Sequence, residues 1–159
     1  MIAERRVWPE IEALYRCRFA RFERVARAVT GDRETALEAV QDGFADALRN
    51  AEQYAGSGPL EAWVWRCVVN RARKARIRPP GTPATVGHSN GRDTSRDHEL
   101  RTHLAALPER QRLVVFLRYY ADLEYREIAG ALGVEVGTVS ATLNAAHANL
   151  RAVLEEAST

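Results

Sequence analysis

At 159 residues, with 46% apolar and 28% charged residues, the chain can form one large or two small soluble domains with their own cores. The net charge of +2 is unevenly divided: residues 1–78 carry 15 Lys or Arg against 11 Asp or Glu (+4), and residues 79–159 carry 8 against 10 (−2). No apolar run is long enough for a secretory signal or a membrane helix, so membrane insertion is not expected. Two cysteines, Cys17 and Cys67, are too few for a disulfide framework or a zinc site and are expected to be buried thiols in a reducing cytoplasm.

Apolar residues recur at three- and four-residue steps through the first half of the chain, which predicts three helices. The apolar face of the first helix comprises Ile11, Leu14, Tyr15, Phe22, Val25, Ala26 and Val29. Asp32 is the expected N-cap of the second helix, whose apolar stripe comprises Leu37, Val40, Phe44, Ala47 and Leu48. After a turn at "AGSGP", the expected core face of the third helix comprises Leu60, Val64, Cys67, Val68, Ala72 and Ala75.

The opposite face of the third predicted helix is basic. It gathers Trp63, Arg66, Asn70, Arg73, Lys74 and Ile77, and the stretch from Trp65 to Arg78 holds six basic residues and no acid. Basic groups contact phosphates, an amide can bind a base edge, and an exposed indole can stack on a base. This face therefore favours nucleic-acid binding. The alternative is a solvated basic face with Trp63 tucked into the core.

A segment rich in Pro, Gly, Ser and Thr, residues 78–97, is the expected linker. Beyond it, two helices are expected on either side of Pro108 and two more around Gly133, where Gly can adopt the left-handed turn. The last pair has the spacing of a helix-turn-helix, with an ordinary helical hairpin as the alternative. The fold class is all-α, with two small helical domains over 1–77 and 98–159.

No pattern in the chain indicates catalysis. There is no activated nucleophile, no phosphate-binding glycine loop and no metal-ligand spacing among His88, His98, His103 and His147. An enzyme, a metal, a cofactor and a small-molecule substrate are therefore not expected.

Three stretches carry a family resemblance: "EAVQDGFADALR", "LEAWVWRCVVNRARKARIR" and "LPERQRLVVFLRYYADLEYREIAGALGVEVGTVSATL". In this order they resemble the most recognisable segments of a bacterial RNA polymerase sigma factor of the extracytoplasmic-function type. The resemblance extends from about Ile11 to Leu154. It implies a sigma-2 domain that binds core polymerase and the −10 element, a sigma-4 domain that binds the −35 element, and a cytoplasmic protein. Core RNA polymerase and promoter DNA are the implied partners, and an anti-sigma protein is a candidate partner.

The resemblance also implies roles for single residues. Residues matching the segment that docks on the polymerase clamp are Gln41, Asp42, Phe44 and Asp46. Residues matching the −10 contacts are Tyr54, Trp63, Arg66, Asn70, Arg71 and Lys74. Those expected at the −35 element are Arg126, Thr138, Ser140, Asn144, His147 and Arg151. Trp63 matches the first of two adjacent aromatics that wedge the duplex in primary sigma factors. The second position is Val64, so strand opening is expected to depend more on base capture by the loop from Tyr54 to Pro59.

The expected recognition helix departs from the family because residues 136–150 contain no Lys or Arg. The helix starts at Glu124 and Glu135 also lack the usual Ser or Thr caps. Since phosphate contacts supply much of DNA affinity, binding by this helix is expected to be weak. Three explanations stay open: a working sigma factor with a relaxed −35 contact, a sigma-like regulator whose C-terminal domain binds protein, and a helical protein unrelated to polymerase.

Overall fold

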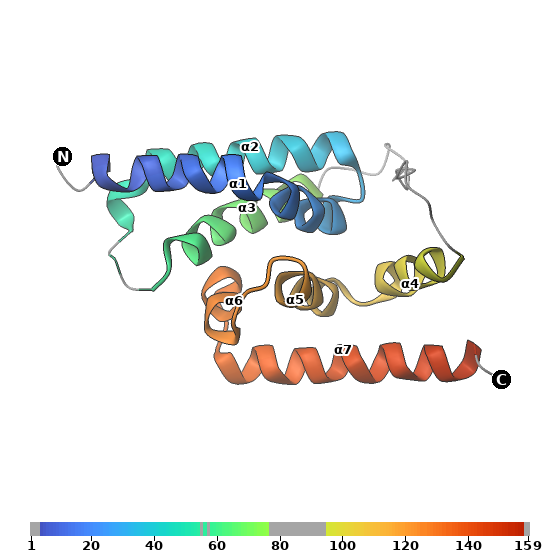
Figure 1. Cartoon of the computed structure of the whole chain (residues 1–159). Helices are drawn as coiled ribbons and strands as arrows, with labels where there is room; N and C mark the ends of the chain where they lie inside the picture. The colour runs from blue at the N-terminus through green and yellow to red at the C-terminus, as the bar shows by residue number, and fades with distance from the viewer. Residues whose placement is uncertain (1–3, 55, 57, 77–94, 158–159) are drawn as a thin grey trace.

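The structure, a computed structural model, describes residues 4–54, 56, 58–76 and 95–157, and its regular elements in these ranges are all helices (Figure 1). This confirms the predicted all-α fold. The elements are α1 (Glu4–Thr30), α2 (Arg33–Arg49), the 3-10 helix η1 (Ala51–Gln53), α3 (Leu60–Arg76), α4 (Ser95–Ala106), α5 (Glu109–Tyr119), α6 (Tyr125–Leu132) and α7 (Val136–Ala157).

The first three helices form the N-terminal module. Asp32 caps α2 as predicted, because its carboxylate accepts a hydrogen bond from the Thr35 amide at 2.9 Å. Helices α2 and α3 approach closely at Gly43, where an added Cβ would lie only 2.6 Å from the Cα of Val68. The absence of a side chain at Gly43 therefore sets the distance between the two helices.

The core of this module differs in part from the predicted one. Trp65 is fully buried and stacks on Phe22 of α1, with ring centroids 3.9 Å apart, although the predicted core face of α3 omitted it. Leu60 and Cys67, which were placed on that face, are only partly buried. The physical reason is that α3 contacts α1, α2 and α6, so its buried side is centred nearer Trp65 than predicted, and Leu60 and Cys67 lie at the edge of that side.

Helices α4 to α7 form the C-terminal module. Gly133 adopts the predicted left-handed conformation, with φ 67°, between α6 and α7. Asp122, between α5 and α6, also has a positive φ of 58°, which Asp tolerates better than most residues. Glu124 caps α6 without a side-chain hydrogen bond, as its chemistry suggested. Most of the predicted linker lies outside the described residues, but its last three residues, 95–97, belong to α4.

The two modules pack against each other. Helix α3 lies against α6 and α1 lies against α5, so the upper and lower layers in Figure 1 are in contact. One cluster of buried apolar side chains includes residues of both modules. Polar contacts between described residues also cross the boundary: the guanidinium carbon of Arg24 lies 5.5 Å from the ring centroid of Tyr120, and Arg73 Nε lies 3.7 Å from Glu109 Oε1.

Candidate nucleic-acid and polymerase interfaces

One line of side chains on α3 remains open to solvent. Arg66, Asn70 and Lys74 are exposed and follow one another at four-residue steps, so they lie along one side of the helix. Among the described residues, neither Arg66 nor Lys74 forms an ion pair. Two unneutralised cations flanking an amide can contact phosphates on either side of a base edge.

Trp63 extends this line by one turn toward the start of α3. Its side chain is partly buried and packs against the core, and its ring centroid lies 5.8 Å from that of Tyr54. The Tyr54 hydroxyl donates a hydrogen bond of 2.6 Å to the carbonyl oxygen of Gly58. The two aromatic rings therefore lie together beside the line of Arg66, Asn70 and Lys74. The Trp63 indole is neither fully exposed nor fully buried, so it lies between the two alternatives expected from the sequence.

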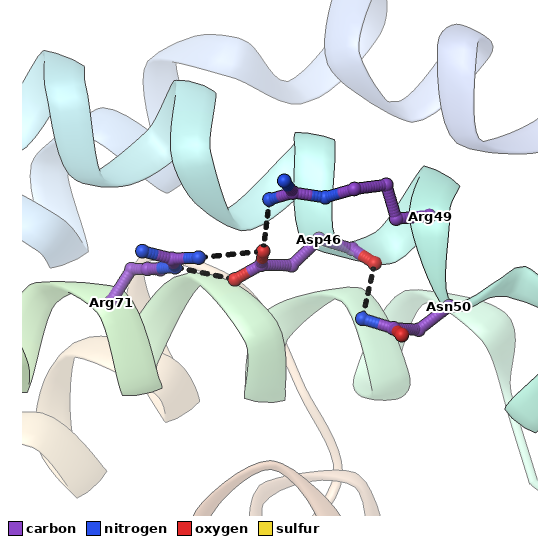
Figure 2. Close-up of polar contacts among 4 residues, drawn as sticks. All are labelled: Asp46, Arg49, Asn50 and Arg71. Atoms are coloured by element: carbon purple, nitrogen blue, oxygen red, sulfur yellow. Dashed lines mark hydrogen bonds and ion pairs between the residues drawn. The ribbon is translucent and has the colours of Figure 1, made fainter.

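Arg71 differs from the other cations of α3 because it is held by Asp46 of α2 (Figure 2). Both Nε and Nη2 of Arg71 donate to the carboxylate, the second at 2.7 Å, and Arg49 Nη2 donates to it at 2.6 Å. Hydrogen bonding by Arg71 is the main cause that lowers the pKa of Asp46 below its ordinary value, while burial acts in the opposite direction. A residue expected to contact polymerase and one expected to contact DNA thus neutralise each other.

The polymerase-docking residues predicted on α2 separate into exposed and internal ones. Gln41 and Asp42 are exposed, whereas Phe44 is 4% exposed and packs edge-on against Tyr15 and Phe22. Phe44 therefore supports the core of the N-terminal module. Its side chain is not available at the surface.

The position of Leu48 differs from the sequence prediction. It was predicted to lie on the apolar stripe of α2, yet its side chain is exposed, and it lies one and two turns beyond Ala45 and Gln41 on the same side of the helix. Its seven-residue spacing from the polar Gln41 was the feature of the sequence that indicated an exposed position. The exposed surface formed by Gln41, Asp42, Ala45 and Leu48 is called the α2 surface below.

The predicted −35 residues lie on different sides of the helix-turn-helix. Asn144 and Arg151 of α7 and Arg126 of α6 are exposed, whereas Thr138 and Ser140 are partly buried. His147 Nε2 lies 2.8 Å from the hydroxyl of Tyr119 on α5, so its ring is engaged within the module.

The solvent-facing side of α7 is formed mainly by small residues. Ala141, Ala145 and Ala148 are exposed there beside Asn144. Thr142 is partly buried, and its hydroxyl donates to the carbonyl of Thr138 at 2.7 Å. The side of α7 that can enter a groove therefore offers shape and one amide, but no positive charge before Arg151.

The described residues offer neither a metal site nor a reactive thiol at the basic line. They contain no group of three or more His, Cys, Asp or Glu that could hold a metal ion, and no helix long and apolar enough to cross a membrane.

The two thiols were both expected to be buried, but Cys17 is exposed. Cys67 is partly buried, and burial, followed by the charge of Asp46, raises the pKa of its thiol to about 11.

Two family matches cover most of the chain. Residues 14–78 match Sigma-70 region 2, and residues 97–150 match Sigma-70, region 4. The match to region 4 favours a DNA-contacting C-terminal module over the protein-binding alternative.

Curated relatives match over 64–92% of the chain. The RNA polymerase sigma-E factor of Streptomyces antibioticus is 30% identical in an alignment of 156 residues, and the match covers 92% of this chain and 85% of that protein. The RNA polymerase sigma factor SigV of Bacillus subtilis is 27% identical over 128 residues, 77% of each chain. The ECF RNA polymerase sigma-E factor of Escherichia coli K12 is 28% identical over 64% of each chain.

Two solved structures share the fold. CnrH, described in complex with the cytosolic domain of CnrY, superposes with a TM-score of 0.70 at 23% identity over 92% of this chain and 88% of that one. RpoE of Bartonella quintana, described in complex with the anti-sigma factor NepR, gives 0.68 at 19% identity over 96% of each chain. In both cases the likeness covers both modules.

Proposed function

This chain belongs to the sigma factors of bacterial RNA polymerase, of the extracytoplasmic-function type, and from that premise we propose which of its surfaces perform each step. It is a transcription initiation factor that directs core RNA polymerase to promoters, with the N-terminal module at the −10 element and the C-terminal module at the −35 element. It acts in the cytoplasm and supplies binding free energy to a reaction that polymerase catalyses.

The proposed contact with the −10 element is the exposed line of Arg66, Asn70 and Lys74 on α3. Arg66 and Lys74 hold phosphates, and Asn70 between them contacts a base edge. Trp63 and Tyr54, paired beside this line, offer stacking surfaces to bases released from the duplex. Arg71 contributes indirectly, because its charge is shared with Asp46 and its role is to join α2 to α3.

The α2 surface is the proposed contact with the polymerase clamp. Asp42 supplies its charge and Leu48 an exposed apolar side chain, a combination that suits a polar interface with an apolar centre. Phe44 and Asp46 position this surface from beneath, through the core and through the bond to Arg71.

A pull-down with core polymerase tests the α2 surface. Asp42→Arg and Leu48→Arg should each abolish co-purification while leaving helix content unchanged, because each places a charge at the centre of the contact. Glu34→Arg is the matched control, since it reverses an exposed acid near the start of the same helix. Undiminished recovery of polymerase by Asp42→Arg and Leu48→Arg would overturn the docking assignment.

The proposed −35 contact offers few positive charges, and it depends on tethering of the C-terminal module near the DNA. Asn144 is the exposed base-contacting group of α7, Arg126 and Arg151 contact flanking phosphates, and the N-terminal module holds the helix near DNA. Such tethering raises the effective concentration of a weakly binding module. An anti-sigma protein is a proposed further partner, supported by the likeness to RpoE, which is described in complex with NepR.

A further inference from the structure

A tyrosine at the end of α5 contacts the DNA-facing helix α7. The hydroxyl oxygen of Tyr119 lies 2.8 Å from Nε2 of His147, and the centres of the two rings are 5.9 Å apart. Tyr119 is 59% exposed, the highest value among the exposed large apolar side chains of the described residues. The contact with His147 therefore leaves most of the Tyr119 side chain in solvent.

This pair lies at one edge of the side of α7 that can enter a groove. His147 comes three residues after Asn144 and four before Arg151, so the three follow one another along the helix, and His147 is turned by about 60° from Asn144. An α-helix with its side chains is about 10–12 Å across, and the major groove is about 12 Å wide. A helix whose centre faces the bases thus has its edges beside the phosphates. With Asn144 toward the bases, Tyr119 and His147 face one phosphate strand.

The hydrogen-bonding capacity of the pair leaves one donor free. A phenol carries one polar hydrogen and an uncharged imidazole carries one, and only one of the two can lie between the rings. Nδ1 of a histidine is bonded close to Cβ and so lies near the helix backbone, whereas the Tyr119 hydroxyl is at the outer end of an exposed side chain.

We propose that Nε2–H of His147 donates to the Tyr119 hydroxyl oxygen and that the Tyr119 hydroxyl donates to a phosphate of the −35 element. The inference rests on the proposed −35 contact and adds a residue to it. Tyr119 binds the DNA, and His147 is a positioning residue that orients the hydroxyl. Tyr119 was not among the residues expected at the −35 element, because it lies on α5, outside the helix-turn-helix.

A neutral donor suits a helix without cations. Tyrosine hydroxyls are among the groups that contact phosphates in protein–DNA complexes. Counterion release follows from neutralised phosphate charge, so such a contact adds affinity without adding to the salt slope. The Tyr119 hydroxyl thereby compensates in part for the lack of Lys and Arg in residues 136–150.

Binding of the holoenzyme to promoter DNA tests the contact. The probe is a duplex that yields a run-off transcript, in full length and truncated between the −10 and −35 elements. At pH 8, where phenol and imidazole are uncharged, Tyr119→Phe should weaken binding to the full-length duplex about five- to tenfold at an unchanged salt slope. It should bind the truncated duplex as the wild type does. Tyr120→Phe is the matched control, because it removes a hydroxyl from the neighbouring ring, which packs on Phe116 and Arg24, and it should bind both duplexes normally.

A second contact between α5 and α7 separates DNA binding from stability. The Asn149 amide donates to Gln111 Oε1 at 2.7 Å. Gln111→Ala removes this contact as Tyr119→Phe removes the other, so both variants should lower the melting temperature, and only Tyr119→Phe should weaken promoter binding. Equal losses of promoter affinity would make Tyr119 purely structural and overturn the inference.

Single neutral phosphates locate the contact. Methylphosphonate placed at each −35 phosphate in turn should, at one position, weaken binding by the wild type without weakening Tyr119→Phe further. His147→Ala should weaken binding less than Tyr119→Phe, and the double variant should bind no more weakly than Tyr119→Phe alone. If Tyr119→Phe binds the full-length duplex as tightly as the wild type, or its effect adds to that of every methylphosphonate, the contact does not exist. Equal wild-type binding to the two duplexes would instead overturn the proposed −35 function, and this contact with it.

Discussion

The cations of α3 differ in what they are free to contact. Lys74 is exposed and unpaired among the described residues, whereas Arg71 donates two hydrogen bonds to Asp46. An arginine that is already neutralised by a carboxylate releases few counterions when DNA binds. The two residues are three positions apart on one helix and make a matched pair for experiment.

Substitution of each by Ala should therefore have different effects on promoter binding by the holoenzyme. Lys74→Ala should reduce the slope of log affinity against log salt by about one, because one phosphate contact is lost. Arg71→Ala should leave the slope unchanged and instead lower the thermal stability of the N-terminal module. A salt titration of binding and a melting curve for each variant provide the measurement. Equal slopes for both variants would contradict the distinction between them.

The thiols of Cys17 and Cys67 should react at very different rates. With a pKa of about 11, Cys67 is a thiolate in only about one molecule in 1,000 at pH 8, and its side chain is also partly buried. Iodoacetamide at pH 8 should therefore modify exposed Cys17 alone in the native chain, and both thiols in guanidinium. Mass spectrometry of the labelled peptides gives the answer, and rapid native labelling of Cys67 would contradict its placement.

At the scale of the element, Gly43 should be necessary for the packing of α2 on α3. Gly43→Ala forces a Cβ to within 2.6–2.9 Å of Val68 and should destabilise the fold by about 1–3 kcal/mol. Gly130→Ala is the matched control, because a Cβ there meets nothing within 4 Å and helix propensity favours Ala by about 0.5–1 kcal/mol. Chemical denaturation measures both changes. A neutral Gly43→Ala would show that the helices are further apart.

The small exposed residues of α7 permit a test of its DNA-facing side. Ala141→Lys with Ala148→Arg should tighten holoenzyme binding to promoter DNA and steepen its salt dependence by about one unit per new phosphate contact. Ala13→Lys with Ala20→Arg adds the same charges to the exposed side of α1 and should have a smaller effect. If both double variants behave alike in a salt titration, this side of α7 does not face the DNA.

Periodicity was sufficient to predict the helices but not everything each helix contacts. The cap at Asp32, the break at Pro108 and the left-handed turn at Gly133 depend on local chemistry, and all three were predicted. The burial of Trp65 was missed because it depends on a partner from another helix, Phe22 of α1, and such a neighbour leaves no mark in the spacing of α3 itself.

The candidate site likewise contains features that the sequence predicts and features that only the fold reveals. The line of Arg66, Asn70 and Lys74 follows from helical spacing within one segment and was predicted. The pairing of Arg71 with Asp46 joins residues 25 positions apart on different helices, so only the fold could reveal it. The exposure of Leu48 was signalled only by its seven-residue spacing from Gln41, and this signal was not decisive, because an apolar residue near the edge of a stripe fits either side of the helix.

The whole molecule should direct core polymerase to promoters through contacts on both modules. Run-off transcription from genomic DNA fragments with purified core polymerase measures this activity. The wild-type chain should yield discrete transcripts that share a −10 and a −35 sequence upstream of their starts, and Asp42→Arg should yield none. Transcription that is independent of the added chain, or starts at unrelated sequences, would contradict the account.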